Sequence, residues 1–146
     1  RVLFRSEGLA LQHTFEAKIE AIGELLKEVE PYESERVEKV NARLAEALTK
    51  VDQSFDENRL AQEMIFYIEK LDVNEEKIRL ANHLSYFMET MGLEKSQGRK
   101  LGFITQEIGR EINTLGSKAN HSEIQKIVVR MKDELEQIKE QVLNVL

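Results

Sequence analysis

Apolar residues recur along the chain at the three- and four-residue spacing of one helical face, with polar residues between them. Two such runs flank Pro31, one from about Glu7 to Glu30 and one from about Ser34 to Val51. Proline lacks the amide donor and crowds the preceding turn, so it ends or kinks a helix. The two runs therefore predict either an antiparallel helical hairpin or a single kinked rod.

Four further helices are expected, at about Glu57–Leu71, Asp72–Met91, Arg99–Leu115 and Ser122–Val145. Asp72 is expected to cap the second of these, because acidic residues follow it in the first turn. Asn120 or Ser122 is expected to cap the last. No segment has the alternation of a strand, and stripes this narrow need partner helices from the same chain or another protomer. The pattern predicts an all-α fold, an elongated bundle of long coiled-coil-like helices.

The expected core consists of the apolar members of each stripe. These are Phe15, Ile19, Ile22, Leu26 and Val29; Val37, Val40, Leu44, Ala47 and Val51; Leu60, Met64, Tyr67 and Leu71; Leu80, Leu84, Phe87 and Met91; Leu101, Ile104, Ile108, Ile112 and Leu115; and Ile124, Val128, Met131, Leu135, Ile138, Val142 and Val145.

Composition supports this fold class and excludes several kinds of site. The 146 residues suit one domain, with 33% charged residues, one proline and no tryptophan. The absence of cysteine excludes disulfides, thiolate-bound zinc and cysteine catalysis, and fits a reducing compartment, so we expect a cytoplasmic protein. No apolar run approaches the roughly 18 residues of a membrane span, and we expect no membrane partner.

The charge is distributed unevenly. The net charge of −6 argues against a broadly basic nucleic-acid binder. Residues 98–132 nevertheless hold seven basic and three acidic residues, a net +4, which leaves −10 for the rest of the chain. This segment either faces an anionic partner or is balanced by neighbouring helices, and charge alone leaves both open.

Two polar clusters admit both a structural and a functional interpretation. Arg59 and Glu63 have the spacing of a surface ion pair worth a few tenths of a kcal/mol, which we favour. Glu76, Arg79 and His83 share one helical face, where they could bind a divalent cation or act as acid and base on a phosphodiester. Alternatively, the acids complement the helix dipole and His83 packs half-buried, which is the commoner arrangement.

A third polar cluster lies between Gly98 and Lys118. Gln106, Arg110, Asn113 and Ser117 lie along one side of the expected helix, with Glu107, Glu111 and Thr114 adjacent. Arg110 and Lys118 could hold phosphate, and Glu107 and Glu111, one turn apart, could share a metal ion. A lattice of ion pairs four residues apart explains the same residues equally well.

Five segments in fixed order resemble the YicC/YloC family of bacterial proteins, in its C-terminal all-helical domain. They are Glu7-Gly8, ENRLAQE (57–63), DVNEEKIRLANH (72–83), GRKLGFITQEIGREINTLGSK (98–118) and ELEQIKEQVLNV (134–145). The resemblance covers nearly all of the chain after Ser6. We expect residues 1–6, RVLFRS, to be a non-native leader, because one reading frame of a common sequencing adapter encodes the same hexapeptide. We expect residues 7–146 to be the YicC-like domain, with the natural N-terminus upstream.

The resemblance implies an endoribonuclease directed at single-stranded RNA, small regulatory RNA included. It also implies a divalent metal (Mg or Mn), a ring-like hexamer that encloses RNA, and a β-containing N-terminal domain that is not part of this sequence. The alternative is a helical oligomerisation or RNA-binding adaptor module without catalysis of its own. The family usually has an acid where this chain has Gly102. If that acid is a ligand or a base, we expect a slow or inactive enzyme.

The matching positions supply the candidate site residues. The catalytic candidates are Asp72, Glu76, His83, Glu107 and Glu111. The candidates for binding RNA phosphates are Arg59, Arg79, Arg99, Arg110, Asn113 and Lys118. The metal candidates are Glu76, Glu107 and Glu111. The motifs do not assign which of these residues cleave RNA and which bind it or build the oligomer.

Overall fold

The computed structural model describes residues 5–49, 58, 61–62, 65–66, 72–92 and 98–144. These ranges contain the helices α1 (Arg5–Thr49), α3 (Asn74–Met91), α4 (Gly98–Lys118) and α5 (Ser122–Leu143). No residue in these ranges is in a strand, so the predicted all-α fold is confirmed. Most of the helix expected at 57–71 lies outside the described residues, although positions 58, 61–62 and 65–66 are helical.

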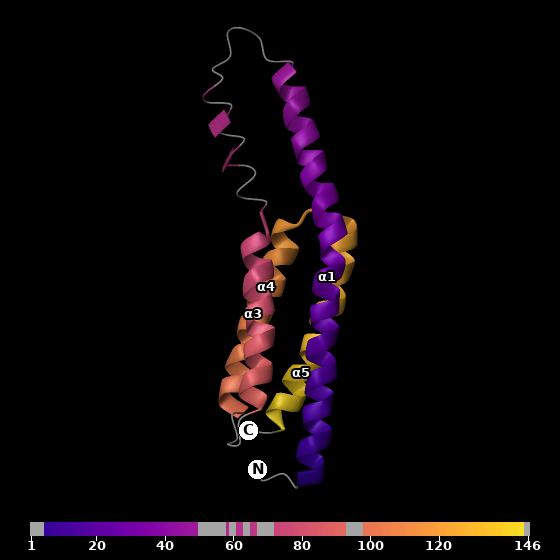
Figure 1. Cartoon of the computed structure of the whole chain (residues 1–146), viewed down its shortest axis with the longest axis vertical. Helices are drawn as coiled ribbons and strands as arrows, with labels where there is room; N and C mark the ends of the chain where they lie inside the picture. Colours follow the sequence, from indigo (N-terminus) through magenta and orange to yellow (C-terminus); the bar gives the residue numbers. More distant parts are fainter. Residues whose placement is uncertain are drawn as a thin grey trace.

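Residues 5–49 form one helix, α1. α1 is 45 residues long and continues through Pro31. The predicted rod is therefore confirmed, and the predicted hairpin at this position is wrong. Pro31 is exposed, and its ring therefore displaces no packed side chain. The buried positions before it, from Phe15 to Val29, hold the rod against the bundle. Figure 1 shows α1 running past the end of the other helices.

The helices form a four-membered bundle in which α1 packs on α5, α5 on α4 and α4 on α3. Of the four neighbouring pairs, α1 and α3 have the smallest contact, so the bundle is closed mainly through the other three interfaces (Figure 1). Between α1 and α3 lies an apolar groove of about 490 Å³, whose walls include Gly23, Leu26 and Ala81. Lys77 bridges this groove at one end, with its Nζ 2.7 Å from Glu30 Oε1.

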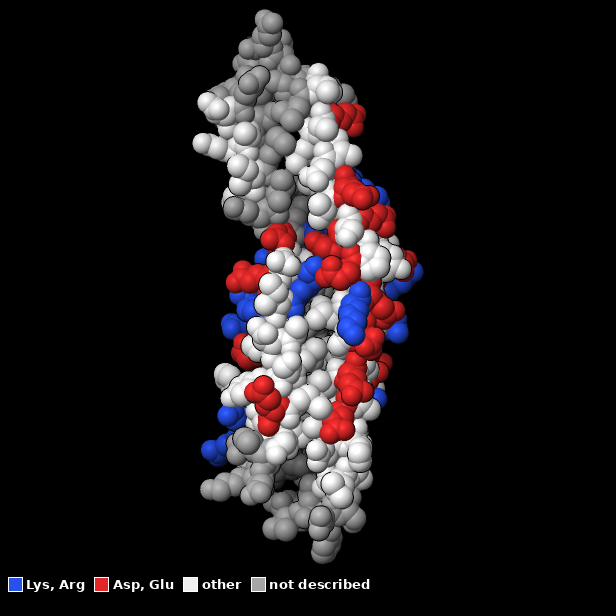
Figure 2. Space-filling view, in the orientation of Figure 1, with Lys and Arg blue, Asp and Glu red and all other residues white. Residues whose placement is uncertain are grey.

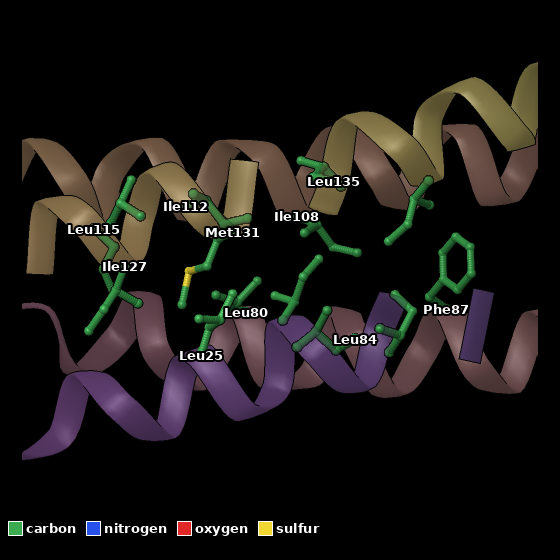
Figure 3. Close-up of a cluster of buried hydrophobic side chains, with 14 of the residues drawn as sticks. Leu25, Leu80, Leu84, Phe87, Ile108, Ile112, Leu115, Ile127, Met131 and Leu135 are labelled. Atoms are coloured by element: carbon green, nitrogen blue, oxygen red, sulfur yellow. The ribbon is translucent and has the colours of Figure 1, made fainter. Parts of the chain in front are cut away.

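The core joins all four helices. Figure 3 shows Ile108, Ile112 and Leu115 of α4 meeting side chains of α5, α3 and α1. Nearly every predicted core position in the described bundle is buried. The first stripe contains Leu25 in the core, with Leu26 only partly buried against it. A residue needs a facing helix to be buried, and the groove beside α3 leaves Leu26 without full cover.

The predicted stripe after Pro31 is largely outside the bundle. Val37 is 48% exposed, so its assignment to the core is wrong for the described part of the chain. Val40 and Leu44 are half-buried. Glu33 and Arg36, both buried, take the positions that face the bundle beside Val37, and farther on α1 extends beyond the other described helices (Figure 1).

Side chains outside the helices cap two of their first turns. Asp72 Oδ1 accepts a hydrogen bond from Asn74 N at 2.9 Å and so satisfies an amide of the first turn of α3, but Val73 occupies the N-cap position, so the prediction of Asp72 as the N-cap is wrong. At α5 the prediction of Asn120 or Ser122 is wrong, because His121 is the N-cap and its Nδ1 accepts from Glu123 N at 3.1 Å. The first amides of a helix have no backbone partner, and an imidazole nitrogen can accept from one of them as the oxygen of a shorter side chain would.

Helix α1 begins at Arg5, inside the expected leader, and residues 1–4 lie outside the described residues. Among the described helices, none combines the length with the low charge that crossing a bilayer requires.

Candidate functional site

Two ion pairs cross from α3 to α4. Glu76 Oε1 lies 2.7 Å from Lys118 Nζ, and Arg79 Nε lies 3.2 Å from the Glu111 carboxylate. Arg79 also lies 3.7 Å from Glu76, which joins the two pairs, and it contacts Glu75 one turn earlier on α3. We call Glu76, Arg79, Glu111 and Lys118 the α3–α4 polar seam. The structure thus brings together residues from two motifs of the sequence.

The seam has its carboxylates inside and its cations outside. The side chains of Glu76 and Glu111 are 2% and 6% exposed, whereas those of Arg79 and Lys118 are 43% and 32% exposed. A buried carboxylate needs a charged or hydrogen-bonding partner, and each has one here. The hydrogen bond from Arg79 to Glu111 raises the pKa of Arg79 above its ordinary value, so the guanidinium stays charged. The two cations of the seam therefore lie at the surface with their carboxylates beneath them, and exposed Glu75 also contacts Arg79.

This arrangement limits what the two carboxylates can do directly. A general base must reach the proton that it removes, and both carboxylates lie beneath the cations that hold them. Glu76 Oε2 is buried and has no hydrogen-bond partner among the described residues. We interpret Glu76 and Glu111 as residues that position Lys118 and Arg79.

Residues of α1 support the seam from a third side. Arg36 Nη2 donates to the backbone oxygen of Lys118 at 3.2 Å, and its Nη1 lies 3.0 Å from both carboxylate oxygens of buried Glu33. The backbone oxygen of Asp72 lies 3.4 Å from Lys118 Nζ. Glu33 and Arg36 were not among the residues predicted from the sequence, because their three-residue spacing is equally typical of a surface pair.

The other catalytic candidates lie farther along the same helices. His83 is half-buried one turn beyond Arg79, and no hydrogen bond or ion pair links it to a described residue. Because Arg79 meets Glu111 and α3 runs antiparallel to α4, His83 and Glu107 lie at a similar level. Glu107 is half-buried and lies 3.8 Å from Arg110 on its own helix. No hydrogen bond or ion pair joins His83 or Glu107 to the seam.

The carboxylates do not form a metal site within the part of the chain that the structure describes. No three His, Asp or Glu side chains there are grouped as metal ligands, and this includes Glu76, Glu107 and Glu111. Each of the three already has a cation beside it, in Lys118, Arg110 and Arg79. This donor set does not fit a divalent ion, because the carboxylates are not grouped and a Lys or Arg charge beside each of them would repel the ion.

The remaining candidates are exposed or outside the described residues. Arg99, Arg110 and Asn113 lie on the solvent side of α4. Arg59 lies outside the described residues.

Gly102 faces α5, where an added Cβ would lie 3.7 Å from Val142 Cγ1. It is nine residues from Glu111, which is half a helical turn around α4 and about 13 Å along it. An acid at position 102 would not join the seam.

A second polar group lies at the turn between α4 and α5 and consists of His121, Glu35 and Tyr32. It was not predicted from the sequence. His121 Nε2 lies 3.6 Å from Glu35 Oε2, and its ring packs against Tyr32 with 5.3 Å between centroids. A hydrogen bond from Lys39 is the largest cause that lowers the pKa of Glu35, and the nearby His121 lowers it further. These contacts join α1 to the start of α5.

Comparison with known proteins identifies relatives along most of the chain. Residues 28–146 match the family model described as "Endoribonuclease YicC-like, C-terminal". A protein of Clostridioides difficile named "Probable endoribonuclease YicC" is 38% identical over 99% of this chain and 50% of its own length. A protein of Haemophilus influenzae with the same name is 36% identical over 70% of this chain and 36% of its own length. The chain therefore spans half or less of the length of these two relatives.

Proposed function

Because this chain belongs to the YicC-like family, in which it corresponds to the C-terminal domain, we propose that it serves an endoribonuclease that binds and cleaves single-stranded RNA. The observation that carries the proposal is the match over residues 28–146 to a family described as endoribonucleases. Relatives at 38% and 36% identity carry the name probable endoribonuclease, which supports the same activity.

We assign phosphate binding to Arg79 and Lys118. Both side chains are partly exposed, and a buried carboxylate fixes the orientation of each. A cation that is held in this way is already oriented before it binds a phosphate. Arg79 would bring a guanidinium charge to a phosphate, and Lys118 would add a second positive charge. Such cations would stabilise the negative charge that develops on phosphate oxygens during cleavage.

We assign the acid/base role to His83. Cleavage of a phosphodiester needs one proton taken from the attacking oxygen and one given to the leaving oxygen. His83 is half-buried one turn from Arg79, and no described carboxylate or cation occupies it. A phosphate held by Arg79 would lie within reach of such an imidazole. Asp72 and Glu107 are the remaining candidates, because neither is buried beneath a cation.

The metal dependence and the hexamer remain proposals for the full-length protein. We propose that cleavage requires Mg²⁺ or Mn²⁺, which would polarise the phosphate and activate water. We place no metal on the seam, because Glu76 and Glu111 are neutralised by Lys118 and Arg79. Cleavage that is lost with a chelator and restored by Mg²⁺ or Mn²⁺ would support this part, and full activity in the chelator would refute it.

The central test measures cleavage of a single-stranded RNA by the full-length protein and its His83→Ala variant. We expect the rate constant to fall by about 10²- to 10⁴-fold in the variant, with RNA affinity largely retained. His13→Ala is the matched control, because His13 is on α1 with a side chain that is 79% exposed. A Gly102→Glu variant tests whether the family acid raises the rate. Intact RNA after incubation of the wild-type protein with both metals would overturn the proposal.

One observation favours a second candidate, an RNA-binding adaptor without catalysis of its own. The two best-positioned carboxylates, Glu76 and Glu111, are both held beneath cations. In that case His83→Ala and Glu111→Gln would leave any cleavage by the full-length protein unchanged. Glu111→Gln would then reduce only RNA affinity, because Arg79 would lose the charge that orients it.

A further inference from the structure

The solvent side of α4 differs in charge from the other described helices. Its exposed residues form one stripe, which begins with the neighbours Arg99 and Lys100 and continues in steps of three and four positions. We call it the outer α4 stripe: Arg99, Lys100, Phe103, Gln106, Arg110, Asn113 and Ser117. The stripe holds three cations and no carboxylate. Each of the other described helices exposes carboxylates, and Figure 2 shows them gathered along α1. The two acids of α4 are Glu107, which is half-buried, and Glu111, which is buried.

A large aromatic ring lies on this positive stripe. Phe103 is 63% exposed, although burying such a ring would stabilise the protein by roughly 2 kcal/mol. It lies one turn from Arg99 and two turns from Arg110. Arg99 makes no hydrogen bond or ion pair with a described residue. Beside the stripe, Lys100 Nζ lies 5.0 Å from the centre of the Tyr86 ring, which is itself partly exposed. Exposed rings and cations thus alternate on one surface.

We propose that the outer α4 stripe binds single-stranded RNA, with Phe103 stacked on a base and Arg99 and Arg110 bound to phosphates on either side. Every base has a π face, and an unpaired strand leaves that face open. A duplex hides its base faces, so a stacking ring favours single strands. Gln106 and Asn113 place amide donors and acceptors on the same stripe, within reach of bases and ribose hydroxyls.

The dimensions of the stripe suit a short stretch of RNA. Arg99 and Arg110 are 11 residues apart, which is about 16 Å along a helix. This length corresponds to about five nucleotides at a stacked spacing of about 3.4 Å. Charge complementarity favours a polyanion over a second copy of this chain. A two-fold contact between two copies of the chain would use the stripe on both. It would therefore place Arg99, Lys100 and Arg110 opposite the cations of the other copy, and these charges repel.

The inference rests on the proposed function for its choice of RNA as ligand, but binding here does not require cleavage. The test therefore uses full-length protein and a fluorescent oligouridine in the presence of a chelator, because the proposed cleavage requires Mg²⁺ or Mn²⁺. We expect Phe103→Ala to weaken binding between about 5-fold and about 100-fold. Phe103→Leu keeps the apolar bulk without the ring, so we expect a similar loss, whereas Phe103→Trp should retain affinity.

Two further measurements separate stacking from a general loss of structure. This chain has no tryptophan, so Phe103→Trp adds a local fluorophore whose emission should be quenched when a base stacks on it. An oligomer of abasic nucleotides should give no quenching. Arg99→Ala should reduce the slope of log Kd against log salt by about 0.7. Val129→Ala is the matched control, because Val129 is 65% exposed on α5, and its affinity should stay within about twofold of wild type.

Unchanged affinity in Phe103→Ala would overturn the inference. It would also be overturned if Phe103→Ala altered only the sedimentation of the protein, because the stripe would then be a contact between copies of the chain. A wild-type protein that binds through Phe103 but leaves cleavable RNA intact would refute the proposed catalysis and keep this inference. If the Phe103→Ala variant cleaved RNA as well as the wild-type protein does, the proposed catalysis would stand and this inference would be refuted.

Discussion

Lys118 Nζ lies 2.7 Å from Glu76 Oε1, and the two residues, 42 positions apart, join the end of α4 to the first turn of α3. The Glu76 side chain is 2% exposed, while that of Lys118 is 32% exposed. The pair is therefore asymmetric. If Glu76 is removed, Lys118 can turn to water, but if Lys118 is removed, a buried carboxylate is left with only the more distant Arg79.

This asymmetry predicts unequal costs for the two single substitutions. We expect Lys118→Met to lower the free energy of unfolding by about 1–3 kcal/mol, because Glu76 loses its nearest cation. Glu76→Met should cost less, and the double variant should recover part of the loss. Urea unfolding of the three variants gives the coupling energy.

Lys126→Met is the matched control, because Lys126 and Glu123 form an exposed pair with side chains 72% and 43% exposed. It should cost less than about 1 kcal/mol. A larger cost for Glu76→Met than for Lys118→Met would contradict the interpretation of Glu76 as the buried, dependent partner.

Two glycines of α4 should respond differently to alanine. At Gly102 an added Cβ would make ordinary contact with Val142 Cγ1 at 3.7 Å, and at Gly109 it would lie only 3.2 Å from Leu135 Cδ2. We expect Gly102→Ala to stabilise the protein by about 0.5–1 kcal/mol, because alanine restricts the unfolded chain. Gly109→Ala should gain less, since Leu135 must shift. Thermal unfolding of both variants tests this order, and equal gains would show that Leu135 adapts freely.

Replacement of Pro31 tests whether the other residues of α1 hold it as one helix despite this proline. Proline in a helix interior removes a hydrogen bond and costs about 3 kcal/mol relative to alanine. We expect Pro31→Ala to raise the free energy of unfolding by about 1–3 kcal/mol without a change in helical circular dichroism, because α1 already continues through Pro31. A loss of stability would show that Pro31 contributes packing that outweighs its missing donor.

The carboxyl of Glu35 should titrate below its ordinary pKa of 4.5, chiefly because of the hydrogen bond from Lys39 and also because of His121. Since the folded pKa lies below the unfolded one, any stability from these contacts is complete above about pH 4.5 and is lost as the pH falls through the folded pKa. Carbon-13 NMR titration measures the shift directly. Lys39→Met should move the pKa of Glu35 upward more than His121→Ala does, and the reverse order would contradict this ranking of causes.

The positions of α3, α4 and α5 could be read from the sequence to within a few residues. Leu101, Ile104, Ile108, Ile112 and Leu115 have helical spacing, and all five are buried. A stripe of this kind has one stable solution, which is to turn its apolar side toward other helices. The same spacing failed for Val37, which is 48% exposed, because Glu33 and Arg36, both buried, take the positions of α1 that face the bundle at this level.

By itself, the sequence determined the helical class, the stripes and the motifs that place the chain in its family, since all of these depend on residues close together along the chain. Only the tertiary structure decided which polar residues are buried. Glu107 and Glu111 are one turn apart and alike in chemistry, yet only Glu111 meets Arg79, which is 32 residues away. Spacing along one helix sets the face on which a side chain lies. The charge that meets it comes from another helix, and the folded bundle alone brings the two together.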